Sequence, residues 1–209
     1  MFRYIYPPRP ETTIPAKSLS IFENMNKFLA QPKLNGSSME IYTDGSSNGS
    51  SISTMNRHNE AISCKMNNDE LIALHKGIGL IVLCGEYMNK NQRDENKNPW
   101  NIKYVIWDII VFNGEHLLGT TFKERYELLV SLYPWVSDKP LLNRISENCY
   151  RVNSITNNFL DNYNHITQFD MYEGLVLKSL NGTLENGTTA NNNTRTQIKC
   201  RKSTKNYNF

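Results

Sequence analysis

LIVLCGEYM (residues 80–88) and KYVIWDIIVFNG (residues 103–114) are the two most apolar runs of the 209-residue chain. Both are rich in β-branched and aromatic residues, which favour strands because they pack well on a pleated surface. We therefore predict that both runs form central, buried strands. The polar segment NKNQRDENKNP between them predicts a surface loop.

Shorter strand-like segments lie on both sides of this pair, and Asn, Gly and Ser residues typical of turns separate several of them. They are FLAQPK, SMEIYT and SISTMN before the pair, and CYRVNSI, EGLVLKSL and TQIKCRKS after it. TDGSSNGSS predicts a turn, and NGTLENGTTANNNT, low in complexity, predicts a mobile loop.

Three segments predict helices. NNDELIALHKG has a candidate cap at Asn68 or Asp69 and a candidate end at Gly77. TFKERYELLVSLYPW carries an apolar stripe, a Thr120/Thr121 start and a Pro134 stop. The stripe consists of Phe122, Tyr126, Leu129 and Tyr133. ITNNFLDNYNHIT is the third helix.

Strands outnumber helices, and many neighbours are joined by short turns, so we predict an α+β domain with largely antiparallel sheets. Residues 1–20 contain four prolines and predict an extended N-terminal arm laid on the surface. Residues 21–209 then form one domain, a size that a single core can support.

Composition points to a protein of a reducing compartment. The four cysteines form no CxxC pair and have no zinc-site spacing, and the start of the chain lacks the apolar region of a signal peptide. We expect a cytoplasmic location (host cytoplasm for a phage or viral source), with no membrane partner. The net charge of +3 suits a protein that meets phosphate in a local groove.

Five short motifs occur in one order: Lys33-Leu34-Asn35-Gly36, Gly85-Glu86-Tyr87, Tyr104-Val105-Ile106-Trp107-Asp108, Glu173-Gly174-Leu175-Val176-Leu177-Lys178 and Gln197-Ile198-Lys199-Cys200-Arg201-Lys202. Each motif alone is weak. As an ordered set they resemble the covalent nucleotidyltransferase superfamily, which includes ATP-dependent DNA ligases, RNA ligases and GTP-dependent mRNA capping enzymes. The resemblance implies a nucleotidyltransferase (adenylation) domain with two β-sheets flanked by helices, in an ATP-grasp-like arrangement.

Lys33 is the predicted nucleophile, which the resemblance implies becomes lysyl-AMP. An ordinary lysine is protonated at neutral pH, so it needs desolvation and neighbouring cations to become nucleophilic. Lys178, Lys199 and Arg201 are the candidate cations, and they would also offset charge on the α-phosphate of ATP. Gly36 would let the backbone approach a phosphate.

Glu86 and Glu173 are the two carboxylates of the motif set. The resemblance places the first near the nucleotide ribose and the second at a divalent metal, Mg²⁺ or Mn²⁺, with Asp108 as a further candidate ligand. Trp107 stands where the family usually has a Phe that stacks on the purine, although plain core packing is an alternative. Gln31 could hydrogen-bond the base edge.

Arg57 resembles the basic position that binds the 5′-phosphate of the acceptor nucleic acid, a contact that suits a guanidinium. A solvated surface arginine is the alternative. The implied partner is a nucleic acid with 5′-phosphate and 3′-hydroxyl ends.

The sequence departs from the family pattern in the lysine motif and in the last motif. Asn35 replaces the usual Asp, Ser38 stands where DNA ligases have Arg, and Arg201 replaces the usual second Lys of the last motif.

The chain ends at Phe209 without the OB-fold region of DNA ligases and capping enzymes. A separate OB-like subunit could therefore join this chain, which we otherwise expect to be a monomer. These features favour an RNA ligase, whereas YVIWDIIVFNGEHLLGTTFKERYELL looks like DNA ligases and capping enzymes. A capping guanylyltransferase and a non-catalytic nucleic-acid-binding relative are the alternatives.

Overall fold

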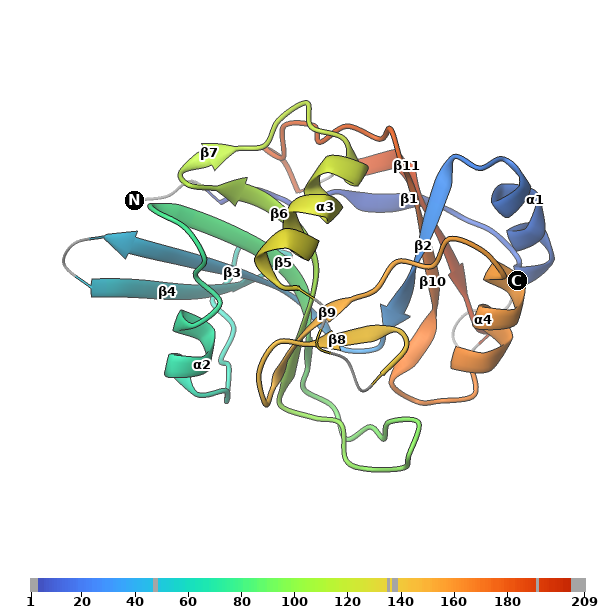
Figure 1. Cartoon of the computed structure of the whole chain (residues 1–209), viewed down its shortest axis with the longest axis horizontal. Coiled ribbons are helices and arrows are strands. Elements are labelled where there is room, and N and C mark those ends of the chain that lie inside the picture. The colour runs from blue at the N-terminus through green and yellow to red at the C-terminus, as the bar shows by residue number, and fades with distance from the viewer. Residues whose placement is uncertain (1–3, 47–48, 135, 137–138, 191, 204–209) are drawn as a thin grey trace.

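The two apolar runs lie side by side in the larger of two β-sheets (Figure 1). They form β5 (Leu80–Met88) and β6 (Lys103–Phe112), which pair antiparallel and are largely buried, as predicted. The structure is a computed structural model that describes residues 4–46, 49–134, 136, 139–190 and 192–203. Residues 47–48 of the expected turn, residue 191 of the expected loop and both chain ends lie outside this range.

The larger sheet has the strand order β4-β3-β5-β6-β9-β8, with β7 attached to β6. Its neighbours are antiparallel except for the parallel pair β6 and β9. The further strands are β3 (Ser37–Ser46), β4 (Gly49–Asn56), β7 (Glu115–His116), β8 (Leu142–Arg144) and β9 (Cys149–Val152).

The smaller sheet has the order β1-β11-β10-β2 and carries three of the predicted motifs. Strands β10 and β11, and β10 and β2, pair antiparallel, whereas β1 and β11 run parallel. The predicted α+β class with largely antiparallel sheets is therefore confirmed. The strands are β1 (Arg9–Thr13), β2 (Phe28–Leu34), β10 (Tyr172–Ser179) and β11 (Asn193–Arg201).

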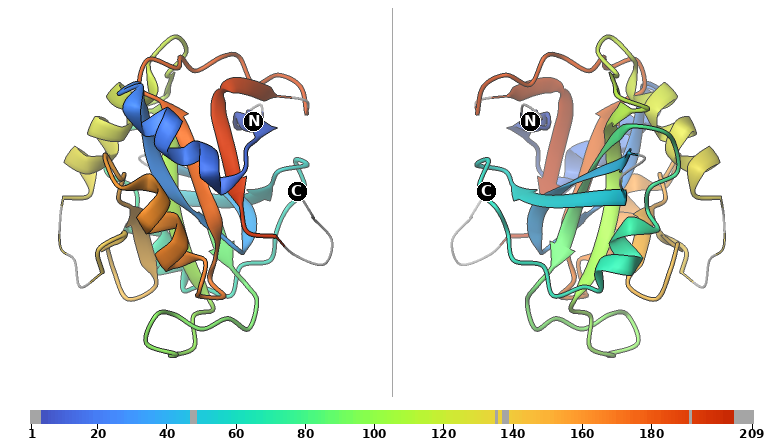
Figure 2. Two further views of the ribbon diagram at one scale, coloured as in Figure 1. Left: turned by 90° about the vertical axis from the view of Figure 1, so that its right-hand side faces the viewer. Right: turned by 90° about the vertical axis from the view of Figure 1, so that its left-hand side faces the viewer.

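The predicted helices cover the sheets from outside. α3 (Phe122–Leu132) begins with a capping box between Thr121 and Glu124, and it packs on β6. α2 (Asn68–Ile72) is capped by Asn67, one residue before the predicted cap, and it ends well before Gly77. α4 (Phe159–Ile166) contacts α1 (Leu19–Asn24), as the left view of Figure 2 shows.

Two expectations for irregular segments need correction. Within the expected arm, residues 9–13 form an edge strand, residues 16–18 form a 3₁₀ turn, and Leu19 is fully buried in the core. Within the expected mobile loop, Leu184 is buried against the larger sheet, and the Tyr6 N–H donates to the Gly187 carbonyl at 2.8 Å. Apolar anchors therefore hold both segments, which composition alone did not reveal.

Gly174 fixes how the smaller sheet presents its motif residues. Its φ of +141° favours glycine, and a Cβ there would lie 2.0 Å from the Cys200 carbonyl oxygen. The register places Gly174 opposite Lys33 of β2, which brings the adjacent Glu173 to the lysine.

No helix among the described residues is long and apolar enough to cross a membrane.

Candidate active site

A cleft of about 420 Å³ lies where the two sheets and the N-terminal segment meet. Strands β2, β10 and β11 contribute residues from one sheet, and β3, β5 and β6 contribute residues from the other. Eight of the predicted site residues line it: Gln31, Lys33, Arg57, Glu86, Trp107, Lys178, Lys199 and Arg201. Glu173 contacts two of these residues directly. The fold thus brings together motifs that lie up to 170 positions apart, between Gln31 and Arg201.

Lys33 belongs to a three-residue ion-pair cluster in which Glu173 is the shared partner. Its Nζ is 2.5 Å from Glu173 Oε2, and Nη2 of Arg201 is 2.9 Å from the same oxygen. Burial raises the pKa of the Glu173 carboxyl, but Lys33 and Arg201 outweigh it and hold that pKa below its ordinary value. An ion pair needs the ammonium form, so attack by Lys33 requires loss of a proton and release from Glu173.

Lys199 lies on β11, two residues before Arg201, and lines the same cleft. Its Nζ donates to the Pro10 carbonyl at 3.4 Å. Burial lowers the pKa of Lys199, and the charges of Arg201 and Lys33 lower it further. A crowded set of cations therefore surrounds Lys33, and such a set is suited to bind phosphate.

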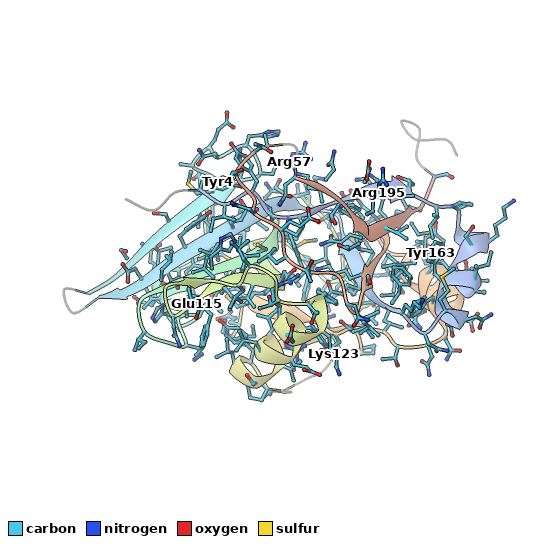
Figure 3. All side chains as sticks on the ribbon, turned by 90° about the horizontal axis from the view of Figure 1, so that it is seen from above. Tyr4, Arg57, Glu115, Lys123, Tyr163 and Arg195 are labelled. Atoms are coloured by element: carbon cyan, nitrogen blue, oxygen red, sulfur yellow. The ribbon has the colours of Figure 1, made fainter. Side chains whose placement is uncertain are left out.

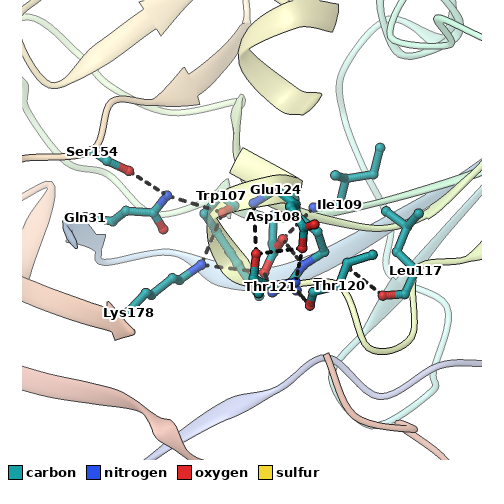
Figure 4. A network of polar contacts seen from close by, with 11 residues as sticks. Gln31, Trp107, Asp108, Ile109, Leu117, Thr120, Thr121, Glu124, Ser154 and Lys178 are labelled. Carbon is teal, nitrogen blue, oxygen red and sulfur yellow. Dashed lines mark hydrogen bonds and ion pairs between the residues drawn. The ribbon is translucent and has the colours of Figure 1, made fainter. Parts of the chain in front are cut away.

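Lys178 lines the cleft with the other predicted cations but is almost entirely buried. It is 3% exposed, its Nζ donates to the Trp107 carbonyl at 3.2 Å, and Asp108 Oδ2 lies 3.8 Å away (Figure 4). The ammonium also lies 4.6 Å from the ring centroids of Trp107 and of Phe122. Burial lowers the pKa of Lys178 to about 8, even though Asp108 opposes that shift. Lys178 thus supports the Trp107 side of the cleft.

Asp108 does not have the geometry of a metal ligand. It is fully buried, and its two carboxylate oxygens accept from Arg125 Nε at 2.9 Å and Arg125 Nη2 at 3.1 Å. Burial raises the pKa of Asp108, but the charges of Arg125 and Lys178 outweigh it and lower that pKa. Because α3 packs on β6, it brings Arg125 onto this carboxylate, so we replace the predicted metal role with a buried ion pair.

Glu86 holds the glycine turn after Lys33. The Gly36 N–H donates to Glu86 Oε1 at 3.0 Å. A Cβ at Gly36 would lie 2.4 Å from the Tyr87 carbonyl oxygen, so glycine permits this close approach. Burial raises the pKa of Glu86 to about 7, although Lys33 and the Gly36 N–H oppose that shift.

Gln31 presents an unsatisfied acceptor beside Trp107. Its Nε2 donates to the Trp107 carbonyl at 3.4 Å and to Ser154 Oγ at 3.5 Å, and the side chain is 2% exposed (Figure 4). Its Oε1 is buried and has no hydrogen-bond partner among the described residues. Because a buried amide oxygen is costly when left unpaired, a ligand N–H such as a purine amine would fit here.

The described residues contain no group of three or more His, Cys, Asp or Glu side chains that could enclose a metal ion. Mg²⁺ keeps several waters and phosphate oxygens when it binds with a nucleotide, so one or two carboxylates are enough. Glu173 fits that requirement, provided that a metal there shares its carboxylate with Lys33 and Arg201.

Two contributors to the site were not predicted. Pro7, Pro8, Arg9 and Pro10 form one wall of the cleft, and Arg125 neutralises Asp108. The proline-rich segment carried no periodicity that would place Arg9 at a site, and Arg125 looked like an ordinary helix residue.

Comparisons with known proteins bear on the family and the fold. Residues 13–195 match the family model described as ATP dependent DNA ligase domain. The fold is similar to mycobacterial DNA ligase D complexed with ATP and MES, with 14% identity, a TM-score of 0.65, and coverage of 96% of this chain and 62% of that chain. It is also similar to the ligase domain of M. tuberculosis LigD, at 13% identity, a TM-score of 0.64 and coverage of 96% and 61%.

An archaeal ATP-dependent RNA ligase is similar at 16% identity and a TM-score of 0.51, with coverage of 93% of this chain and 48% of that chain. These identities show a shared fold alone. The chain spans about three-fifths of the two mycobacterial proteins and about half of the archaeal one. No curated protein matches the chain.

Proposed function

Because the chain belongs to the ATP-dependent DNA ligase domain family, we propose that it is the adenylation domain of a polynucleotide ligase that carries AMP on Lys33. The observation that carries the proposal is the contact of Lys33 with Glu173 in a cleft that Lys199 and Arg201 also line. The substrates are ATP and a nucleic acid with 5′-phosphate and 3′-hydroxyl ends.

The first step joins AMP to the protein. Deprotonated Lys33 Nζ attacks the α-phosphorus of ATP, an N–P bond forms, and the bond to the pyrophosphate oxygen breaks. Arg201 and Lys199 offset the negative charge that grows on the phosphate oxygens. Glu173 would hold Mg²⁺ or Mn²⁺, which supplies further positive charge to those oxygens.

The next two steps move AMP and seal the ends. A 5′-phosphate oxygen of the nucleic acid attacks the phosphorus on Lys33, the N–P bond breaks, and the lysine nitrogen takes up a proton. The 3′-hydroxyl oxygen then loses its proton and attacks the 5′-phosphorus, which forms a phosphodiester and releases AMP. Lys33 is thus free for another cycle.

Three further residues that line the cleft suit the nucleoside. We assign the contact with the adenine amine to Gln31 Oε1, which has no partner among the described residues, and the contact with the ribose to Glu86, which lines the same cleft. Trp107 can stack on the purine with the ring face that Lys178 does not cover, since the Lys178 ammonium lies over the other face.

We further propose that RNA ends, or nicks that contain RNA, are the preferred substrates, on the basis of Asn35 and Ser38. The structure also supplies a local reason for Asn35. Its Nδ2 donates to the Asp170 carbonyl at 3.2 Å, and its Oδ1 accepts from Lys90 Nζ at 2.8 Å. An ionised Asp would lack the donor for the first bond.

Adduct formation tests the proposal. The protein is incubated with Mg²⁺ and α-³²P-labelled ATP or GTP, beside Lys33→Ala and the control Lys27→Ala, which alters an exposed lysine outside the cleft. We expect an ATP adduct in the wild type and in Lys27→Ala, and none in Lys33→Ala. A GTP-only adduct would select the capping alternative. No adduct with either nucleotide would contradict covalent catalysis.

Sealing assays then compare matched DNA, RNA and hybrid nicks. Faster sealing of RNA ends than of DNA ends supports the substrate preference, and the reverse order refutes it. If the protein forms the AMP adduct but seals ends only after addition of a separate OB-fold protein, that protein is a partner subunit. Size-exclusion chromatography tests the expectation that the chain is a monomer.

A further inference from the structure

The segment between β5 and β6, residues 89–100, is an ordered loop that takes no part in the chemistry proposed above. Figure 1 shows this β5–β6 loop in green at the lower edge of the molecule. Arg93 pairs with Pro99 in an isolated bridge, and the Trp100 N–H donates to the Gln92 carbonyl at 2.8 Å. Bonds within the β5–β6 loop therefore give it a defined shape, which its polar composition did not indicate.

One arm of the β5–β6 loop contacts the turn that follows Lys33. Gln92 Nε2 donates to the Asn35 carbonyl, and the Gly36 N–H donates to Glu86 Oε1 at 3.0 Å. This carbonyl and this N–H belong to the same peptide group, which is planar, so the two contacts together fix its orientation. Because β2 ends just before this peptide, they also restrict the strand end that carries Lys33.

Neighbouring residues of the β5–β6 loop reinforce this arm. Lys90 Nζ donates to Asn35 Oδ1 at 2.8 Å, and Asn89 Nδ2 donates to Ser37 Oγ at 2.9 Å. Asn35 and Ser37 are only half-buried, whereas Gln92 is 6% exposed. The Gln92 amide therefore makes the best shielded of these contacts, and a shielded hydrogen bond competes less with water.

The other arm of the β5–β6 loop reaches the residue before Glu173. Tyr172 is fully buried, and its Oη donates to Glu95 Oε1 at 2.6 Å. Lys139 Nζ lies 2.9 Å from the second oxygen of the same carboxylate. The register between β10 and β2 shifts around Glu173, which makes Glu173 the extra residue of a β-bulge. Bulges re-aim side chains, and Glu95 anchors the strand beside this one.

Gln92 has a feature that a purely structural side chain would avoid. Its Oε1 is buried and has no hydrogen-bond partner among the described residues. An unpaired buried acceptor lowers stability, which an apolar side chain of similar length would not do. The amide of Gln92 is therefore explained better by its donor, which binds the Asn35 carbonyl, than by packing.

We propose that the β5–β6 loop is a positioning element for adenylation and that Gln92 is its positioning residue. The loop holds the turn after Lys33 with one arm and the bulge at Glu173 with the other. It thereby sets the geometry in which the amine leaves the carboxylate and approaches the α-phosphorus of ATP. This role rests on the proposed function, and Gln92 acts in it through the peptide between Asn35 and Gly36.

Single-turnover adenylation tests this role. Wild type, Gln92→Met and Tyr172→Phe are mixed with Mg²⁺ and α-³²P-labelled ATP over a range of ATP concentrations, and thermal unfolding confirms that each variant is folded. Gln168→Met is the matched control, because it also removes a bond from a glutamine amide to a carbonyl, that of Asn164 at 3.1 Å. Gln168 is exposed and lies just after α4, the helix on which Figure 3 labels Tyr163.

We expect Gln92→Met to lower the maximal adenylation rate by about tenfold or more, because a small misplacement of a reacting group slows a reaction steeply. The ATP concentration at half-maximal rate should change by less than about threefold, because the residues that bind phosphate are untouched. Tyr172→Phe removes only the hydroxyl donor to Glu95 and should slow the reaction less, because Lys139 still holds the loop. Gln168→Met should match the wild type.

Two results would overturn the positioning role. One is an unchanged maximal rate in folded Gln92→Met. The other is a change confined to the ATP concentration at half-maximal rate, which would make Gln92 a contributor to ATP binding.

Hydrogen exchange keeps this inference separate from the catalytic proposal. Mass spectrometry follows deuterium uptake by the peptide that contains residues 33–38, in the wild type, Gln92→Met and Gln168→Met. Faster uptake in Gln92→Met alone would show that the β5–β6 loop holds the turn, even if the wild type forms no lysyl-AMP and the proposed function fails. Unchanged uptake in folded Gln92→Met refutes the positioning role even if lysyl-AMP forms.

Discussion

Replacement of Asp108 by Asn distinguishes a buried ion pair from a metal ligand. Asp108 is 0% exposed and Arg125 is 3% exposed, and two hydrogen bonds of 2.9 and 3.1 Å join them. The substitution keeps the size of the side chain but removes its charge. It leaves the guanidinium of Arg125 and the ammonium of Lys178 buried together without their shared counter-ion.

Removal of one partner from a buried ion pair costs about 3–5 kcal/mol, because the remaining charge stays desolvated. The asparagine oxygen can still accept one hydrogen bond, so we expect a loss near the lower limit, about 3 kcal/mol. For a chain of this length each kcal/mol lowers Tm by about 2–4 °C, which predicts a fall of roughly 6–12 °C.

Urea and thermal unfolding measure this loss. The control is Glu127→Gln, which breaks an exposed pair with Lys123 on the same helix as Arg125, and it should cost about 0.5 kcal/mol or less. In the wild type, Asp108 opposes the lowering of the Lys178 pKa by burial. Removal of the Asp108 charge should therefore lower the pKa of Lys178 further below about 8.

Stability within about 1 kcal/mol of the wild type would refute the ion-pair reasoning. If such a stable variant needed a higher Mg²⁺ concentration for adenylation, Asp108 would instead be the metal ligand that the sequence suggested.

Two further predictions concern pH and the capping of α3. Burial raises the pKa of Glu40 and of Glu86 from 4.5 to about 7, so between these values the folded state binds more protons than the unfolded state. The free energy of unfolding should therefore fall as pH rises through that window. Urea unfolding at several pH values measures this decline, and Glu40→Gln should make it less steep. An unchanged slope in Glu40→Gln would contradict the prediction. Thr121→Ala removes the capping box of α3 and should cost about 1 kcal/mol in thermal unfolding, whereas Ser131→Ala, at the far end of the same helix, should cost less.

Much of the fold could be predicted because its signals are local. The apolar, β-branched composition of residues 80–88 and 103–112 was sufficient to predict two central strands, since burial of such segments needs no knowledge of distant partners. The stripe from Phe122 to Tyr133 predicted α3 for the same reason. The first residue of α2 was harder to predict, because Asn67 and Asn68 are both of a residue type that caps helices well. The backbone conformation decides which of the two is the cap.

The order of the motifs predicted the family, which the family model confirms, and it is the basis for our proposal that Lys33 is the nucleophile, because chemistry restricts which residue types can serve at each step. Contacts between residues far apart in the sequence could not be predicted in this way. Nothing local to Asp108 indicates that Arg125 lies across from it, and nothing in the proline-rich start indicates that Arg9 lines the cleft. Sequence by itself thus determined which residues could do the chemistry, and the packing of α3 and β1 against the sheets decided which of them are neutralised in the interior and which face the cleft.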